Sequence, residues 1–189
     1  MRKISKFLSL VLRHRPDAIG ITLDSGGWTS IAELVEKARK AGVRLSGPLV
    51  RQVVTTSDKQ RFCISGDGLR IRANHGHSLP EIDLGLQPAV PPEILFHGTA
   101  RHLLTSIAAQ GILPGRRQMV HLTESYEAAA GNGRRHGTPV VLRIFAGRMH
   151  AEGFRFYRSA SGVWLTERVP VGYVVAEVSG ALLQYNTDY

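Results

Sequence analysis

A short basic segment, residues 12–16, has the composition of a phosphate-binding site. It reads Leu-Arg-His-Arg-Pro and places Arg13, His14 and Arg15 in a row at the end of a predicted helix. An arginine guanidinium presents a planar set of donors that matches phosphate oxygens, and a histidine can share or supply a proton near neutral pH. The same residues also suit a helix C-terminus, because cations there oppose the negative end of the helix dipole. The residue types leave both interpretations open.

Two further basic positions are candidates for binding the same anion. Arg61 opens a predicted hairpin, and Arg116 and Arg117 lie in a predicted turn after the sequence Leu-Pro-Gly. Hydrophobic periodicity does not bring these positions near residues 12–16. Whether they share one ligand therefore depends on the tertiary fold.

A second kind of candidate is a His-Gly-Thr sequence at the end of a predicted strand. His97, Gly98 and Thr99 follow the apolar run Ile-Leu-Phe. A glycine at such a position lets a ligand approach the backbone, and a threonine can donate a hydrogen bond to it. The sequence His-Leu-Thr at residues 121–123 is a weaker signal of the same kind. Both sequences also have many purely structural uses.

Several classes of site are missing from the sequence. It has no Walker loop, no Gly-x-Gly-x-x-Gly after a strand and no paired Cys/His spacing for zinc. Cys63 is the single cysteine, so an internal disulfide is excluded and a reducing cytoplasm is the expected compartment. The histidine pairs His75/His77 and His97/His102 lack a partner acid at ligand spacing, so we expect them to pack and not to bind metal.

The first candidates must be positioned by residues 1–75, which we predict to form a winged-helix-like module. Apolar residues at 3.6-residue spacing indicate helices, and β-prone runs on either side of an Asp-Gly turn indicate a hairpin. The predicted elements are a helix from Ile4 to Arg13, a helix capped by Thr29 or Ser30 and ending near Gly42, a helix that starts at residues 46–48, and strands at residues 61–64 and 69–72.

Residues 76–92 are a predicted linker, because they lose periodicity and gather proline and glycine. Residues 93–189 are predicted to form a second lobe of many short strands and few helices, so the whole chain is predicted to be α+β. The predicted elements of this lobe are a helix at residues 101–110 and strands at residues 94–99, 120–123, 140–144, 154–157, 163–166 and 173–175.

Positive charge is concentrated at the front of the chain. The formal net charge is +9, and residues 1–75 carry fourteen Lys/Arg against six Asp/Glu, a net +8. Such a field attracts polyanions, nucleic acid first and acidic membrane surfaces second, although the charge can also serve solubility alone. No apolar run approaches the roughly 20 residues needed to cross a bilayer. We expect the basic N-terminal segment to be a helix of the mature protein, since residues 13–15 interrupt its apolar run.

Taken together, these segments resemble the RNA 2′-phosphotransferase family over essentially the whole chain and in the family's order. Seven blocks carry the resemblance, which makes it far more specific than any one motif. They lie at residues 3–16 (KISKFLSLVLRHRP), 24–34 (DSGGWTSIAEL), 61–78 (RFCISGDGLRIRANHGHS), 96–100 (FHGTA), 116–125 (RRQMVHLTES), 136–144 (HGTPVVLRI) and 156–170 (FYRSASGVWLTERVP).

The resemblance implies a winged-helix RNA lobe joined to an ADP-ribosyltransferase-like NAD lobe. It implies an Arg-His-Arg-Arg set around the reacting phosphate, which in this sequence is Arg13, His14, Arg61 and Arg117. The implied NAD site consists of His97, Gly98, Thr99, His121, Leu122 and Thr123. The expected partners are NAD and an RNA with an internal 2′-phosphate, without a metal or a membrane, and the protein is expected to be a monomer.

The reaction implied by the resemblance has two steps. The RNA 2′-phosphate attacks the anomeric carbon of the NAD ribose, which expels nicotinamide and leaves an ADP-ribosylated phosphodiester. The ribose 2″-hydroxyl then attacks that phosphorus and releases RNA with a 2′-hydroxyl and ADP-ribose 1″,2″-cyclic phosphate. Phosphoryl transfer of this kind depends on positioning and electrostatic stabilisation, which an arginine cluster supplies in place of Mg²⁺.

Two positions depart from the family pattern. His75 replaces a glutamine, which puts the linker contacts in question, and Met119 replaces a histidine, which removes a polar group near the proposed cofactor pocket.

Two other functions are also considered. One is a winged-helix regulator whose rear lobe senses a nucleotide. Against it, Arg13 and Arg61 flank the module and do not fill its recognition helix. The other is an ADP-ribosyltransferase that stops after the first step.

Overall fold

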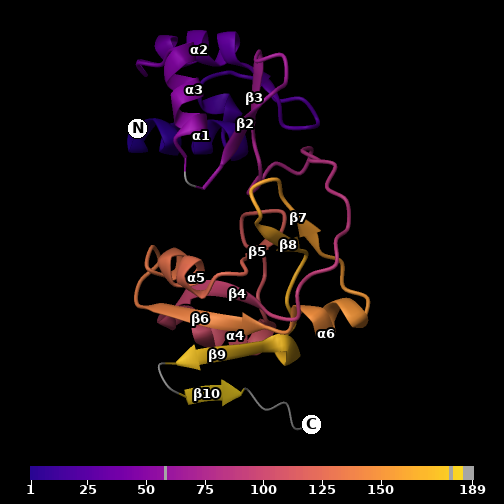
Figure 1. The fold of residues 1–189 in the computed structure, drawn as a ribbon. Helices are drawn as coiled ribbons and strands as arrows, with labels where there is room; N and C mark the ends of the chain where they lie inside the picture. The colour runs from indigo at the N-terminus through magenta and orange to yellow at the C-terminus, as the bar shows by residue number, and fades with distance from the viewer. Residues whose placement is uncertain (58, 179–180, 185–189) are drawn as a thin grey trace. The chain divides into compact units, whose positions relative to one another are not determined.

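The computed structural model describes residues 1–57, 59–178 and 181–184 (Figure 1). The chain divides into two compact units, which we call unit 1 (Met1–Leu86) and unit 2 (Gln87–Tyr189). Helices and small antiparallel sheets occur together, in agreement with the predicted α+β class. Across the described ranges, no helix is both long and apolar enough to cross a membrane.

Unit 1 places a small antiparallel sheet beside a group of helices (Figure 1). The strands lie in the order β1, β3, β2, so the hairpin strand β3 pairs with both of the others. The elements are α1 (Arg2–Arg13), the 3-10 turn η1 (Pro16–Ala18), β1 (Thr29–Ser30), α2 (Ile31–Lys40), α3 (Gly47–Thr55), β2 (Phe62–Ile64) and β3 (Arg70–Ala73).

Local sequence explains most of these boundaries. The Ser30 side chain accepts the Glu33 N–H at the start of α2, and Ser46 caps α3 in the same way. The β2–β3 turn places Gly68 at a φ of +74°, a conformation that glycine adopts without strain. Strand β1 was not predicted, because its two residues are defined only by pairing with β3.

The core of unit 1 forms where the apolar faces of the three helices meet the sheet. Its buried residues come from all three helices, from β2 and β3 and from the connecting loops, which fixes the end of α1 relative to the start of β2. They are Leu8, Val11, Leu12, Ile21, Ile31, Leu34, Ala38, Leu45, Val50, Val53, Phe62, Ile71 and Ala73.

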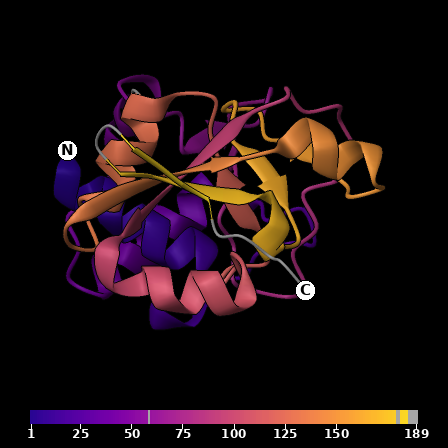
Figure 2. The same ribbon diagram turned by 90° about the horizontal axis from the view of Figure 1, so that it is seen from below.

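Unit 2 is built on two antiparallel sheets, with strand orders β10-β9-β6-β4 and β5-β8-β7. Helices α4 and α5 lie on opposite sides of β4, β6 and β9 (Figure 2). The elements are β4 (Leu95–Ala100), η2 (Arg101–Leu103), α4 (Leu104–Gln110), β5 (Val120–Leu122), α5 (Tyr126–Gly133), β6 (Pro139–Ile144), α6 (Ala146–Ala151), β7 (Tyr157–Arg158), β8 (Trp164–Thr166), η3 (Val171–Tyr173), β9 (Val174–Val178) and β10 (Ala181–Gln184).

The predicted strands of the second lobe correspond to β4, β5, β6, β7, β8 and β9, with shifts of a few residues. Helices α5 and α6 and strand β10 were not predicted. The sequence of α5, YEAAAGNG, contains small residues and two glycines, which give it no apolar periodicity. Its position comes from packing against β4 and β6, near the candidate residues His97 and Gly98.

Candidate active site

The end of α1 carries the first two predicted catalytic residues. Arg13 is the last residue of the helix, and His14 follows as its C-cap. Leu8, Val11 and Leu12 are completely buried on the same helix, so the core determines where Arg13 and His14 lie. Arg13 is itself only 8% exposed, which is rare for an arginine and requires partners for the charge.

Arg13 contacts the residues that open β2. Its Nη2 donates a hydrogen bond to the carbonyl oxygen of Arg61 over 3.3 Å, and its guanidinium carbon lies 5.7 Å from the centroid of the Phe62 ring. The carbonyl dipole and the ring face both stabilise a buried positive charge. The fold therefore brings Arg13, His14 and Arg61, which are far apart in sequence, together within unit 1.

A segment that we call the return segment, residues 74–78, follows β3 and holds the start of β2. The Asn74 N–H donates to the Arg61 carbonyl oxygen over 2.9 Å. The Asn74 side-chain Nδ2 donates to the carbonyl oxygen of Gln60 over 2.6 Å. The Arg61 carbonyl thus accepts from both Asn74 and Arg13, which fixes the backbone beside the Arg61 side chain.

The other end of the return segment contacts α1. The Ser78 N–H donates to the Arg13 carbonyl oxygen over 3.0 Å. The Ser78 Oγ lies 3.0 Å from His14 Nδ1 and 3.4 Å from the same Arg13 carbonyl oxygen. Sequence reasoning did not select Ser78, and its only signal was a place in the block of residues 61–78.

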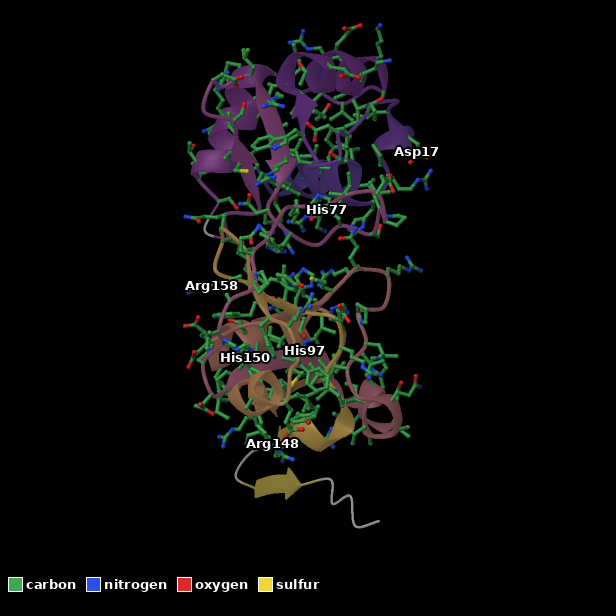
Figure 3. The ribbon with its side chains drawn as sticks, turned by 90° about the vertical axis from the view of Figure 1, so that its right-hand side faces the viewer. Asp17, His77, His97, Arg148, His150 and Arg158 are labelled. Atoms are coloured by element: carbon green, nitrogen blue, oxygen red, sulfur yellow. The ribbon has the colours of Figure 1, made fainter. Side chains whose placement is uncertain are left out.

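His77, also in the return segment, reports on the electrostatics of this region. It belongs to unit 1 and is only 2% exposed; Figure 3 labels it. Burial, together with the smaller effects of the positive charges of Arg13, His14 and Arg72, lowers its pKa from 6.5 to about 4. His77 is therefore neutral at neutral pH, in surroundings that disfavour another cation and favour an anion.

In unit 2, the two segments predicted to form the NAD site lie side by side. Phe96 and Thr123 exchange backbone hydrogen bonds of 2.8 and 3.0 Å, which join β4 to the end of β5. His97 Nδ1 lies 3.0 Å from the carbonyl oxygen of His121. Because a carbonyl only accepts, Nδ1 must carry the proton, and the neutral ring then has its lone pair on Nε2.

Gly98 has a use that its sequence context did not indicate. A Cβ atom at this position would lie 1.7 Å from the carbonyl oxygen of Ala129, so the glycine allows α5 to approach β4. Thr99 and Leu122 are also buried, at 3% and 2% exposure. These residues pack within unit 2, whereas the side chains of His97, His121 and Thr123 are only partly buried.

Two basic side chains, Arg117 and His136, act on His97, which Figure 3 labels within unit 2. Burial is the main cause that lowers the pKa of His97, the His121 carbonyl opposes it, and the charges of Arg117 and His136 lower the pKa further. Desolvation and the charge of Arg135 lower the pKa of the Arg117 guanidinium. Arg117 therefore belongs to the His97 group. Sequence reasoning missed Arg135 and His136, although they stand in a basic run before β6.

Glu124, which follows Thr123, anchors this part of unit 2. Its Oε1 accepts a hydrogen bond from Trp164 Nε1 over 2.7 Å and forms an ion pair with Arg158 Nη2 at 3.1 Å. The Arg158 guanidinium carbon lies 5.5 Å from the centroid of the Trp164 ring. Glu124 was also missed by sequence reasoning, and these contacts tie the end of β5 to the β7–β8 hairpin.

Met119 contacts the candidate residue His121 through its backbone. His121 Nδ1 donates to the Met119 carbonyl oxygen over 3.0 Å, a contact that does not depend on the side chain at position 119. The predicted catalytic residues are thus distributed between the units, with Arg13, His14 and Arg61 in unit 1 and Arg117 in unit 2. Among the residues that the structure describes, no group of three or more His, Cys, Asp or Glu side chains is placed to hold a metal ion.

The chain is similar to a family of known proteins over most of its length. The family model described as "RNA 2'-phosphotransferase, Tpt1 / KptA family" matches residues 1–168. A protein of Acaryochloris marina named probable RNA 2′-phosphotransferase is 53% identical over 175 residues, covering 93% of this chain and 96% of that protein. Proteins with the same name from Pectobacterium carotovorum and Agrobacterium fabrum are 53% identical over 171 residues (90% and 92% covered) and 50% identical over 177 residues (94% and 95% covered). The chain therefore belongs to the RNA 2′-phosphotransferase family.

Proposed function

We propose that this protein is a transferase that removes an internal 2′-phosphate from RNA, with NAD⁺ as the acceptor substrate. Family membership supports the transfer of an RNA 2′-phosphate. The observation that carries the proposal is Arg13, a nearly buried cation held by the Arg61 carbonyl directly beside His14. A nearly buried charge costs stability, and binding of the reacting phosphate would explain why the protein keeps one at this position.

Unit 1 is the proposed RNA-binding part. Its element order of helix, strand, helix, helix, strand, strand is that of a winged helix, which supports the proposed winged-helix lobe. The net charge of +8 in residues 1–75 suits an RNA backbone. In the proposal, the lobes span residues 1–75 and 93–189 and are joined by the linker at residues 76–92.

Unit 2 is the proposed NAD-binding part, with an ADP-ribosyltransferase-like fold. His97 has its Nδ1 proton directed to the His121 carbonyl, so its Nε2 lone pair can accept a hydrogen bond from a ribose hydroxyl. The charges of Arg117 and His136 near this ring, and that of Arg135 near Arg117, fit the pyrophosphate of a dinucleotide. The residues present therefore fit NAD⁺. Gly98, Thr99 and Leu122 would shape this site through the backbone, since their side-chain positions are packed against the rest of unit 2.

NAD⁺ supplies an activated anomeric carbon with nicotinamide as the leaving group. In the proposed first step, the RNA 2′-phosphate attacks this carbon and nicotinamide leaves. In the second step, the ribose 2″-hydroxyl loses its proton and attacks the phosphorus, and the RNA 2′-oxygen leaves and gains a proton. The products are nicotinamide, RNA with a 2′-hydroxyl and ADP-ribose 1″,2″-cyclic phosphate.

The roles of the basic residues follow from their chemistry. Arg61 and Arg117 would hold the phosphate through both steps, because guanidinium groups pair with phosphate oxygens in any protonation state of the substrate. Arg13 and His14 would act mainly in the second step, where charge increases on the phosphorus oxygens and a proton must move to the leaving 2′-oxygen. Arginine side chains provide this electrostatic stabilisation without proton loss at neutral pH.

The direct test uses a short RNA with one internal 2′-phosphate. The purified protein is incubated with this RNA, with and without NAD⁺ and without added metal, and the products are identified by mass. The same RNA with a 2′-hydroxyl in place of the phosphate is the control. We expect NAD⁺-dependent loss of the phosphate together with nicotinamide and ADP-ribose 1″,2″-cyclic phosphate.

Arg117→Ala tests the assignment of roles. By analogy with the loss of an oxyanion donor, it should lower turnover roughly 10²- to 10³-fold. Arg116→Ala, at the neighbouring arginine, which is exposed like Arg117, is the matched control and should retain activity. Unchanged turnover in Arg117→Ala would overturn that residue's role. Accumulation of an ADP-ribosylated RNA by the wild type would indicate a transferase that stops after the first step, and sequence-specific duplex binding without turnover would indicate a regulator.

A further inference from the structure

The return segment at residues 74–78 contacts the ring of His14 through Ser78. Ser78 Oγ lies at 3.0 Å from His14 Nδ1 and at 3.4 Å from the carbonyl oxygen of Arg13. The Ser78 N–H, which donates to the same carbonyl over 3.0 Å, keeps the serine backbone in place. One hydroxyl is therefore positioned between a ring nitrogen and a carbonyl oxygen.

The direction of these hydrogen bonds follows from the number of hydrogens. A serine hydroxyl has one hydrogen to donate, and a carbonyl oxygen can only accept. Both contacts are hydrogen bonds only when Ser78 donates to the Arg13 carbonyl and accepts from a proton on His14 Nδ1. If the hydroxyl donated to Nδ1 instead, its contact with the carbonyl would place two acceptors together.

This arrangement also serves both charge states of the histidine. A protonated imidazolium has hydrogens on Nδ1 and Nε2, so Ser78 must again accept from Nδ1 and donate to Arg13. Proton gain and loss at Nε2 therefore require no rotation of the serine hydroxyl. A site whose dipoles do not reorganise when a proton moves is the kind of environment that lowers the barrier to proton transfer.

We propose that Ser78 is a positioning residue that holds His14 as the Nδ1–H tautomer and assigns proton exchange with the substrate to Nε2. This inference rests on the proposed function for its catalytic meaning, whereas the tautomer of the ring is a property of the protein alone. Asn74, at the other end of the return segment, holds the backbone at Arg61 by donating to the carbonyl oxygens of Gln60 and Arg61. The return segment thus orients both Arg61 and His14.

The first test is spectroscopic and needs no substrate. The full-length protein is labelled with ¹⁵N-histidine, His14 is assigned from the signals missing in His14→Gln, and its two-bond ¹⁵N–¹H pattern identifies the protonated nitrogen. We expect the neutral His14 ring of the wild type to be the Nδ1–H tautomer and that of Ser78→Ala to be a mixture of tautomers. An Nε2–H tautomer in the wild type, or an unchanged pattern in Ser78→Ala, would overturn the proposal.

The second test measures turnover of the RNA carrying a 2′-phosphate. Loss of a hydrogen bond to a charged group corresponds to a fall in kcat of roughly 10- to 100-fold for Ser78→Ala. Ser78→Thr keeps the hydroxyl and should recover most of the activity. Ser9→Ala is the control, because Ser9 donates to the Ser5 carbonyl on the same helix and does not contact His14. A folded Ser78→Ala protein with wild-type kcat would contradict the positioning role.

The two tests separate the two ideas. If the wild type has no phosphotransferase activity, the proposed function fails, but the NMR pattern still decides whether Ser78 sets the tautomer. If the wild type is active and the pattern does not depend on Ser78, the positioning role fails and the proposed function stands.

Discussion

Acid should destabilise unit 1 through His77. The pKa of this histidine falls from 6.5 to about 4 in the folded protein, chiefly because the ring is buried. The unfolded chain therefore binds more protons than the folded one between these values, so the stability that His77 contributes is complete above about pH 6.5 and is lost as the pH falls toward about 4. For one such group the free energy of unfolding should decrease by about 2 kcal/mol between about pH 7 and about pH 5.

Urea unfolding followed by tryptophan fluorescence measures this loss. In a Trp164→Phe background, Trp28 is the reporter, and it lies in unit 1. In this background, His77→Asn should start from a lower stability, because a buried ring is removed, but should lose about 2 kcal/mol less than the parent on acidification. His150→Asn, at an exposed histidine of unit 2, controls for the removal of a histidine as such (Figure 3).

One result of these unfolding measurements would contradict the prediction. If the parent and His77→Asn lose the same free energy of unfolding between about pH 7 and about pH 5, His77 does not carry a depressed pKa in the folded protein. The inference of electropositive surroundings from Arg13, His14 and Arg72 would then lose its support.

Two further predictions concern unit 2. Gly98→Ala should lower the free energy of unfolding by about 3 kcal/mol or more, because the new Cβ would meet the Ala129 carbonyl oxygen at 1.7 Å. Gly131→Ala is the control and should leave thermal stability equal or slightly higher, because a Cβ there has nothing within 4 Å. Equal melting temperatures for the two variants would refute the packing argument. Arg135→Ala should raise the KM for NAD⁺ about two- to fivefold with little change in kcat, as expected for an exposed charge that binds ground and transition states alike. Arg148→Ala, at another exposed arginine, is the control and should leave the KM unchanged. A fall in kcat alone in Arg135→Ala would contradict this role.

Local sequence was sufficient where one segment contains its own determinants. The helix from Ile4 to Arg13 was predictable from apolar spacing, and it extends from Arg2 to Arg13 in the structure. The β2–β3 hairpin was predictable from its Asp-Gly turn, since Gly68 adopts a positive φ there. Where a segment has no pattern of its own, as in β1 and α5, only its long-range partner defines it.

The candidate site likewise contains residues that the sequence could select and residues that it could not. Residue chemistry and the family resemblance selected Arg13, His14, Arg61 and Arg117 from the sequence. They did not select Ser78, Glu124 or Arg135, because a serine, a glutamate or a surface arginine carries no signal until its neighbours are known. The expected role of Gly98 shows the same limit, because a glycine that admits a ligand and one that admits a helix look alike in sequence.

The sequence by itself determined the chemical types at the site, the helix that ends in Arg13 and His14, the excess of positive charge in residues 1–75 and the family. Only the tertiary structure decided that the Arg61 carbonyl accepts from Arg13, that Ser78 contacts His14, and that His77 is buried and neutral. The physical reason is that periodicity and capping act within a few residues, whereas hydrogen-bond direction, burial and pKa depend on groups that the chain brings together from distant positions.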